Sequence, residues 1–102
     1  MTRRVEWSRE ALDDFKHQID YIADRNEAAA RRVADRIRSA GDALGATRTG
    51  RPGRMPGTYE KSVTGLPYII AYSAQEIDGS DTVSILRVIH TARDWPRGRW
   101  PR

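Results

Sequence analysis

The residue best suited to proton transfer in this 102-residue sequence is His90. An imidazole titrates near neutral pH without help from its surroundings, so it can serve as a general acid or base. The other histidine, His17, falls on the polar face of a predicted helix, whereas His90 ends the last predicted strand beside a basic tail. The structural alternative is a strand-end imidazole that bonds a backbone carbonyl.

Cationic and polar side chains elsewhere in the sequence suggest a reaction in which His90 could transfer a proton. Cleavage of RNA by its own 2′-hydroxyl needs a base, cations for the phosphorane oxygens and an acid for the leaving oxygen. Arg87 could brace a phosphate, or it could lie on the solvated face of its strand. The further candidates are Lys61, Glu60 and Tyr59 on a second strand, and Arg51 and Arg54 on a loop. A charged edge strand is the simpler interpretation of the strand residues, and solubility or docking that of the loop arginines.

The positive charge is concentrated in the second half of the chain. Residues 1–46 carry nine Lys or Arg and nine Asp or Glu, whereas residues 47–102 carry nine and five and hold the whole net charge of +4. Such a field steers toward anionic partners, namely nucleic acid, an acidic protein surface or anionic lipid. A solvated face in an arginine-rich composition is the alternative.

Several classes of site are excluded or disfavoured by composition. Because there is no cysteine, a disulfide framework, a thiolate metal site and a thiol nucleophile are excluded. No feature calls for a metal or an organic cofactor, since the glycine-rich stretch Gly50–Gly57 precedes a strand and not a helix. We find no secretory signal and no apolar run long enough for a membrane span, so we expect a cytoplasmic protein with no membrane partner.

The first half of the chain predicts a strand and two helices. Arg3–Trp7 alternates charged and apolar residues, which is typical of a half-buried strand. Ser8 is a predicted N-cap, and apolar residues at i, i+3 and i+4 spacing after it predict a helix of about four turns. Asn26 is the predicted cap of a second helix with an apolar stripe from Ala30 to Leu44. The short link between them predicts an antiparallel helical hairpin.

The second half predicts a loop and three strands. Gly45 to Gly57 contains four Gly and two Pro, which predicts a loop. The predicted strands are Thr58–Val63, Tyr68–Ala74 and Thr82–His90, with a turn at Asp78-Gly79-Ser80 and an irregular basic tail from about 91 to 102. The order β-α-α-β-β-β predicts one α+β domain over residues 1–102, with the N-terminal strand and helical hairpin packed on a small antiparallel sheet.

The order, length and charge distribution resemble the RelE/ParE superfamily of toxins from bacterial type II toxin–antitoxin pairs. The resemblance covers roughly residues 3–96 and rests on motifs in this order: Val5-Glu6-Trp7-Ser8, Tyr21-Ile22, Gly50–Thr58, Tyr68-Ile69-Ile70-Ala71-Tyr72, and Ile85–His90 running into Ala92-Arg93-Asp94-Trp95. It implies one of two activities. RelE-like members cut messenger RNA on the ribosome, whereas ParE-like members bind DNA gyrase and block it.

Departures from the ribonuclease pattern favour the ParE-like branch. RelE-like members place an Arg where this chain has Leu66-Pro67-Tyr68-Ile69, and some carry a Tyr directly after the His, where this chain has Thr91. Loss of one such electrostatic donor costs on the order of a hundredfold in rate or more. We therefore predict direct inhibition of gyrase with no catalytic residue favoured. A ribosome-dependent ribonuclease is the alternative, and its catalytic set would be His90, Arg87, Lys61 and Arg54. A non-toxic basic nucleic-acid-binding domain is the third hypothesis.

Two contact surfaces are predicted. Arg and Trp dominate interface hot spots, and the predicted target-binding residues are Arg87, His90, Arg93, Trp95, Arg97 and Trp100. The resemblance also implies a cognate acidic antitoxin that wraps the toxin, with a helix on the helical hairpin or a strand on a sheet edge. The predicted antitoxin-binding residues are Leu12, Phe15, Ile19, Ile37 and Leu44.

Overall fold

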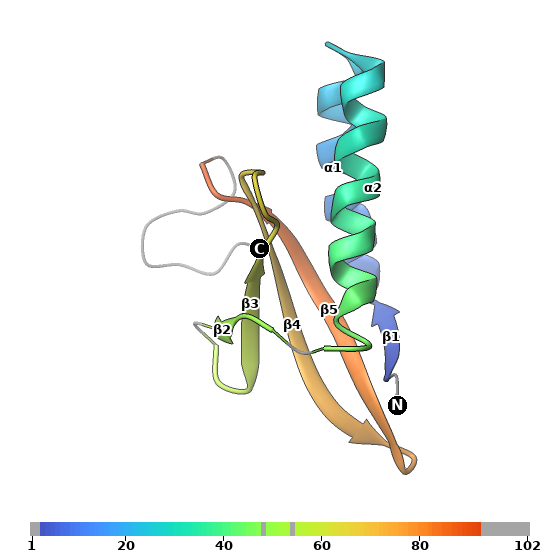
Figure 1. Ribbon diagram of the computed structural model, residues 1–102, viewed down its shortest axis with the longest axis vertical. Coiled ribbons are helices and arrows are strands. Elements are labelled where there is room, and N and C mark those ends of the chain that lie inside the picture. Colours follow the sequence, from blue (N-terminus) through green and yellow to red (C-terminus); the bar gives the residue numbers. More distant parts are fainter. Residues whose placement is uncertain (1–2, 48, 54, 93–102) are drawn as a thin grey trace.

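The computed structural model describes residues 3–47, 49–53 and 55–92. In chain order the elements are β1 (Arg4–Trp7), α1 (Arg9–Ala23), α2 (Glu27–Ala43), β2 (Arg51–Pro52), β3 (Thr58–Ser62), β4 (Tyr68–Ile77) and β5 (Ser80–His90). Figure 1 shows the two helices side by side as a hairpin, next to a strongly twisted sheet. The predicted α+β class and the strand-helix-helix-strands order are confirmed.

Both helices begin at the predicted caps. The Ser8 Oγ accepts a hydrogen bond from the Ala11 N–H at 3.0 Å, and the Asn26 Oδ1 accepts one from the Ala29 N–H at 2.9 Å. Each side chain thereby satisfies a backbone donor that the first helical turn leaves without a partner.

Neither of the two helices that the structure describes has the length and apolar character that a membrane-spanning helix needs.

Strands β2 to β5 form the predicted small antiparallel sheet, and β1 adds a parallel strand at its edge. The strand order is β1-β5-β4-β3-β2, and β1 pairs parallel to β5, from Arg4 opposite Thr82 to Trp7 opposite Ile85. A parallel pair needs a long crossover connection. Here all of the chain between the two strands, both helices included, supplies that connection.

A short strand lies inside the predicted loop from Gly45 to Gly57. Strand β2 pairs antiparallel with β3, with Arg51 opposite Glu60. Gly50 makes this approach possible, because a Cβ on it would lie 2.4 Å from the backbone oxygen of Glu60 and its φ is +115°. Gly50 therefore does more than interrupt regular structure, because the absence of a Cβ lets the backbones of the two segments approach each other.

The β4–β5 hairpin is longer than predicted and carries a bulge. Its turn residues Asp78 and Gly79 both have positive φ, 51° and 77°, as a two-residue hairpin turn of type I′ requires. Ala71 lies opposite Arg87 while Tyr72 lies opposite Ile85, so Leu86 is the extra residue in β5. A bulge of this kind bends its strand and redirects the side chains beside it.

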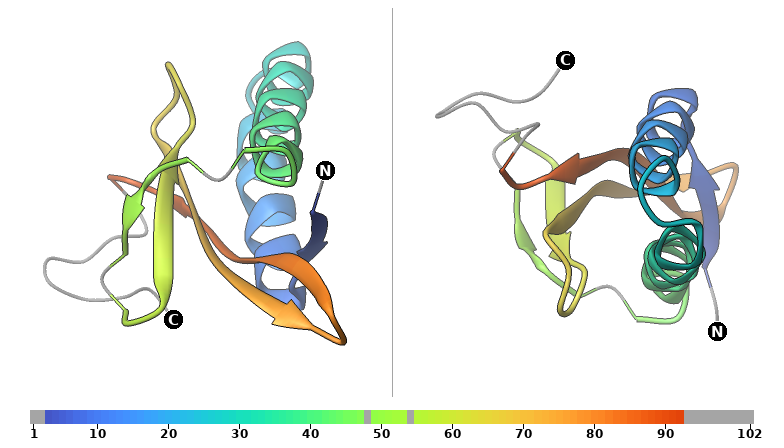
Figure 2. Two further views of the ribbon diagram at one scale, coloured as in Figure 1. Left: turned by 60° about the horizontal axis from the view of Figure 1, so that its bottom comes forward. Right: turned by 90° about the horizontal axis from the view of Figure 1, so that it is seen from above.

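Figure 2 shows the helical hairpin on one side of the sheet, and the core is built from residues of both layers. Its buried members are Ala11, Ile37, Leu44, Val63, Tyr68, Ile70, Tyr72, Val83, Ile85 and Val88. Helix α2 lies close to the sheet at Gly41, where a Cβ would lie 2.5 Å from the Trp7 ring and 2.8 Å from the Ile85 Cδ1. Any side chain at this position would force the Trp7 ring, the Ile85 side chain or α2 itself to shift.

Candidate functional site

Arg87, the predicted phosphate brace, is bound by Asp14 of α1. The Asp14 Oδ2 accepts hydrogen bonds from the Arg87 Nε at 2.7 Å and from the Val88 N–H at 3.0 Å, and its Oδ1 accepts one from the Arg87 Nη2 at 2.9 Å. The two side chains are only 18% and 17% exposed. The guanidinium therefore neither points freely at a ligand nor lies on a solvated strand face, which were the two interpretations from sequence.

The local fold explains why Asp14 meets this strand. Strand β1 pairs with β5 only as far as Ile85, and the start of α1 then takes over that edge. The Ser8 N–H donates to the Ile85 carbonyl at 2.9 Å, and the Ser8 hydroxyl donates to the Leu86 carbonyl at 3.1 Å. Asp14 lies further along α1 and accepts from the Val88 N–H, a donor that β1 does not reach.

His90 lies at the end of β5, as predicted, and contacts a neighbouring strand and the backbone that follows. It packs edge-on against Tyr68, with ring centroids 5.2 Å apart and an interplanar angle of 86°. Its Nδ1 accepts a hydrogen bond from the Ala92 N–H at 3.1 Å. In this hydrogen bond the imidazole nitrogen is the acceptor and the backbone N–H is the donor.

The strand register separates the other members of the predicted ribonuclease set. Lys61 lies opposite Ile70, and Tyr68 lies opposite His90. Lys61 and His90 are thus on strands with β4 between them, which puts their strand axes about 10 Å apart. Arg87 is bound by Asp14, and Arg54 lies outside the described residues. At the start of β4, where the ribonuclease pattern has an Arg, Tyr68 is 3% exposed and belongs to the core.

Glu60 is a buried carboxylate on β3. Its side chain is 3% exposed, and its Oε1 lies 3.5 Å from the Nη2 of Arg51, which is 70% exposed. The register places Glu60, Ala71 and Arg87 in one row across three strands. Within the described ranges, no group of three or more His, Asp or Glu residues could hold a metal ion.

The predicted antitoxin-binding residues divide into two groups. Leu12 is 51% exposed, and Phe15 and Ile19 are partly buried against the core. Ile37 and Leu44 are 0% and 1% exposed, so this part of the prediction needs correction. Their stripe of α2 faces the sheet and offers no surface to a partner.

Of the six predicted target-binding residues, the structure describes Arg87 and His90. The other four, Arg93, Trp95, Arg97 and Trp100, lie outside the described residues. Sequence reasoning missed Asp14, which fell on the polar face of its helix with other charged residues. No local signal distinguishes it, because its partner Arg87 lies 73 positions away.

Comparisons with known proteins agree with the fold and name the family. Residues 5–95 match the family model described as "ParE toxin of type II toxin-antitoxin system, parDE". The chain is similar to Y4kP of Sinorhizobium fredii (strain NBRC 101917 / NGR234), a protein named as a candidate toxin. The two are 38% identical over 96 residues, which cover 93% of this chain and 95% of that protein.

Two solved structures share the fold. One belongs to the chromosomal ParDE toxin–antitoxin system of P. aeruginosa, with a TM-score of 0.74, 20% identity, and coverage of 85% of this chain and 94% of that one. The other is a YoeB/ParE toxin from Agrobacterium tumefaciens, with a TM-score of 0.56, 14% identity and coverage of 83% and 94%. The family match extends over most of the sequence, strands and helices alike. This chain therefore belongs to the ParE toxin family and is the toxin of a type II toxin–antitoxin system.

Proposed function

We propose that this toxin acts by binding DNA gyrase and blocking it, and that a cognate acidic antitoxin neutralises it in the cytoplasm. The observation that carries the choice of mechanism is the engagement of Arg87 by Asp14 through three hydrogen bonds that include the Val88 backbone. A guanidinium that already donates hydrogen bonds to both oxygens of a carboxylate is poorly placed to stabilise the phosphorane of RNA cleavage. This supports action by contact over action by RNA cleavage.

The neighbourhood of His90 supports the same choice. A ribonuclease needs cations within hydrogen-bond reach of the phosphate that is cleaved. In the part of the chain that the structure describes, the ring of His90 meets the aromatic ring of Tyr68 and the Ala92 N–H. Strand β4 lies between His90 and Lys61. A clamp that needs Lys61 beside His90 is therefore not favoured by the strand order.

A supercoiling assay with purified gyrase tests the proposal. We expect the toxin to inhibit supercoiling at saturating concentration, and the antitoxin, added in equimolar amount, to restore it. A translation reaction programmed with a defined messenger RNA serves as the parallel measurement, and its message should stay intact.

Three outcomes would contradict the proposal. Unchanged supercoiling together with cuts in the translated message would make the protein a ribosome-dependent ribonuclease. Unchanged supercoiling, an intact message and no growth arrest on expression would favour a non-toxic nucleic-acid-binding domain, whose affinity falls steeply with salt. Supercoiling that stays blocked after the antitoxin is added would refute neutralisation by that partner.

A further inference from the structure

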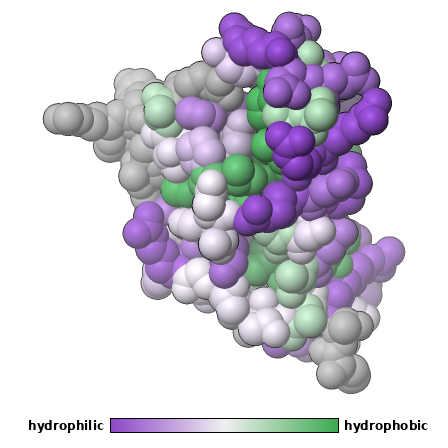
Figure 3. All heavy atoms as spheres, turned by 45° about the horizontal axis from the view of Figure 1, so that its top comes forward, coloured by the Kyte–Doolittle hydropathy of each residue, from purple (hydrophilic) through white to green (hydrophobic). Residues whose placement is uncertain are grey.

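A hollow of about 490 Å³ lies between the second half of α2 and the end of β3. Two of its apolar residues, Leu44 and Val63, are 1% and 2% exposed, so they form its floor. Figure 3 shows apolar atoms where the hydrophilic surface of the helices meets the rest of the molecule. The residues around the floor are of a different kind, and they indicate what the hollow could bind.

Hydroxyl groups surround this floor. They belong to Ser39 of α2, to Thr47 and Thr49 in the segment after that helix, and to Ser62 and Thr64 at the end of β3. All five residues are exposed. Among the residues that the structure describes, none of these hydroxyls has a hydrogen-bond partner. They are therefore free to donate to a ligand.

Two cations line the hollow from opposite walls. Arg36 lies on α2 and Lys61 on β3, and the described lining includes no carboxylate. Lys61 follows Glu60 in the chain, but successive side chains of a strand point to opposite faces. The buried carboxylate of Glu60 therefore lies on the other face of the sheet. Within the described ranges, neither Arg36 nor Lys61 has a carboxylate partner.

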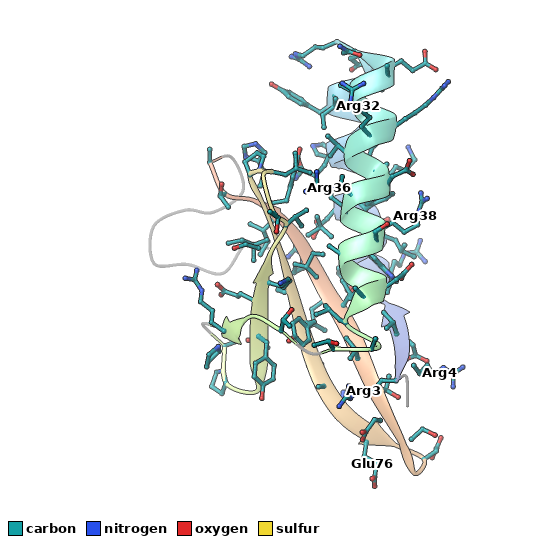
Figure 4. All side chains as sticks on the ribbon, viewed as in Figure 1. Arg3, Arg4, Arg32, Arg36, Arg38 and Glu76 are labelled. Carbon is teal, nitrogen blue, oxygen red and sulfur yellow. The ribbon has the colours of Figure 1, made fainter. Side chains whose placement is uncertain are left out.

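Arg36 makes a neutral contact that leaves most of its donors available. Its Nη2 donates to the Thr64 carbonyl, and a guanidinium has five N–H groups. Figure 4 shows Arg36 on the side of α2 that faces the sheet and Arg38 on the opposite side. Hydrogen bonds from a guanidinium to an anionic oxygen are stronger than those to a neutral carbonyl. An anion in the hollow could therefore bind Arg36 without the loss of an ion pair.

This combination of groups suits the phosphates of a nucleic acid backbone. Proteins hold phosphate oxygens with Arg, Lys, Ser and Thr side chains, and a carboxylate in the same hollow would repel them. The α2 wall from Arg36 to Ala43 is about 10 Å long at the helical rise per residue. Because duplex DNA has one phosphate per about 3.4 Å along each strand, this length matches about three consecutive phosphates.

The lining favours a duplex over single-stranded RNA. Single strands are held largely by aromatic side chains that stack on their bases. The described residues that line this hollow include no Phe, Tyr, Trp or His. The hollow therefore offers contacts to a backbone and no platform for bases, so its binding would not depend on sequence.

The neighbouring hollow, toward the start of α2, is less suited to phosphate. It has about 470 Å³, and Arg32 and Arg36 contribute its cations. Its described lining also includes the carboxylate of Asp35 and no hydroxyl group. Phosphate oxygens would meet one repulsive charge there and fewer donors.

We propose that the hollow of Arg36, Lys61 and the five hydroxyls binds the backbone of the duplex DNA that gyrase holds. The two cations pair with phosphates, and the hydroxyls donate to phosphate oxygens. The toxin thereby contacts the enzyme and its DNA together, and it binds DNA-bound gyrase more tightly than DNA-free gyrase. This assignment rests on the proposed inhibition of gyrase.

DNA binding by the full-length toxin alone tests the hollow independently of gyrase. A short fluorescent duplex of mixed sequence is titrated at several salt concentrations and followed by anisotropy. We expect the double variant Arg36→Gln/Lys61→Gln to weaken binding roughly tenfold or more at low salt. It should also lower the slope of log affinity against log salt by about two, since each phosphate contact contributes about 0.9.

The matched control removes the same number of charges from α2 outside the hollow. Arg31 and Arg38 are exposed cations that pair with Glu27 and Asp35. We expect Arg31→Gln/Arg38→Gln to change the affinity less than about threefold, because rim charges away from the contact act only through the screened field. Circular dichroism spectra check that each variant is folded.

A second variant keeps both cations and places a carboxylate between them and the DNA. Ser39→Glu should weaken DNA binding several-fold at low salt, and the loss should shrink as salt is added. Its control is Ala28→Glu, which adds the same charge at another exposed position of α2 and should have little effect.

Binding to immobilised gyrase, with and without DNA, connects the hollow to the proposed function. The wild-type toxin should bind DNA-bound gyrase more tightly. The Arg36→Gln/Lys61→Gln variant should lose that preference and still bind DNA-free gyrase like the wild type. If the wild-type toxin binds gyrase in neither state, the proposed function fails, whereas the anisotropy measurement still decides whether the hollow binds DNA.

Three results would overturn the assignment. Equal losses of DNA affinity in the two double variants would mean that the charges act without a defined site. Tighter binding of a single-stranded RNA of the same length, with the same dependence on Arg36 and Lys61, would make RNA the ligand. Displacement of the DNA by low millimolar inorganic phosphate would make the hollow a site for a free anion.

Discussion

Two arginine-bearing regions of this toxin differ in what lies opposite the guanidinium. At the α1–β5 junction, Arg87 is 18% exposed and bound at 2.7 and 2.9 Å by the carboxylate of Asp14. On the side of α2 that faces the β3–β4 turn, Arg36 is exposed and its guanidinium donates to the neutral backbone carbonyl of Thr64. The first arginine holds a helix to a strand. The second has no carboxylate partner among the described residues.

The difference shows that the tertiary fold, and not the local motif, decides whether an arginine is already paired with a carboxylate. Arg87 stands in a motif shared with a nuclease-containing superfamily, beside a histidine and a basic tail, whereas Arg36 stands in an ordinary helix. The residue that sequence reasoning selected for ligand binding is the one that the fold uses internally. The outward-facing cations of α2, Arg32 and Arg36, were singled out by no motif.

The largest expected effect tests the internal role of the α1–β5 junction. We expect Asp14→Ala to lower the free energy of unfolding by about 3 kcal/mol, since it leaves a largely buried guanidinium and the Val88 N–H without their acceptor. Urea denaturation monitored by circular dichroism measures the change. The matched control is Asp13→Ala, which removes an exposed carboxylate one position earlier and should change stability by less than about 0.5 kcal/mol. Equal effects of the two variants would contradict the comparison.

A smaller effect is expected when the cation itself is removed. Arg87→Ala should cost about 2 kcal/mol, less than Asp14→Ala, because Asp14 keeps its bond to the Val88 N–H and can be reached by water. Arg36→Ala should cost under about 0.5 kcal/mol, since its partner carbonyl is exposed. The same denaturation curves compare the two arginines directly. A cost for Arg36→Ala as large as that for Arg87→Ala would place Arg36 among the structural residues.

The parts of the fold that were predictable depend on neighbours in sequence. The caps Ser8 and Asn26 and the turn at Asp78 act within a few residues, so their residue types suffice to predict them. The parallel pairing of β1 with β5 and the strand β2 depend on contacts between distant segments, and Gly50 serves as a close-approach residue only once Glu60 is beside it. The spacing of apolar residues predicts where strands and helices lie, but it does not predict which segments they pair with or pack against.

The candidate site was less predictable for the same reason. The end of the last strand at His90 could be predicted, but its bond to Ala92 and its contact with Tyr68 follow from the register and the turn. In α2 the sequence gives one broad apolar stripe. Only the packing divides it into a buried face through Ile37 and an open face through Ala40 and Ala43.

The N-cap at the start of α1 gives a third, smaller test of the junction. Ser8→Ala should lower stability by about 1 kcal/mol, because the Ala11 N–H loses its acceptor and the Leu86 carbonyl loses a donor. Ser8→Thr keeps both hydroxyl bonds and should restore most of that loss. The thermal midpoint of each variant, measured at one protein concentration, reports the change. If Ser8→Ala matches the wild type, the hydroxyl does not help hold α1 to β5.

The smallest effect on stability, and the sharpest contrast with Asp14, is expected at the exposed Arg32 of α2. Arg32→Gln should leave the free energy of unfolding within about 0.5 kcal/mol of the wild type, since Arg32 has no ionic partner among the described residues. Its charge should act instead on encounter with the antitoxin. Because rim charges steer association, the rate constant for binding should fall a few-fold at low salt, and the difference should shrink as salt is added. Stopped-flow measurements at two ionic strengths test this. A loss that is independent of salt and confined to dissociation would mean that Arg32 is a buried contact of the complex and not part of its electrostatic rim.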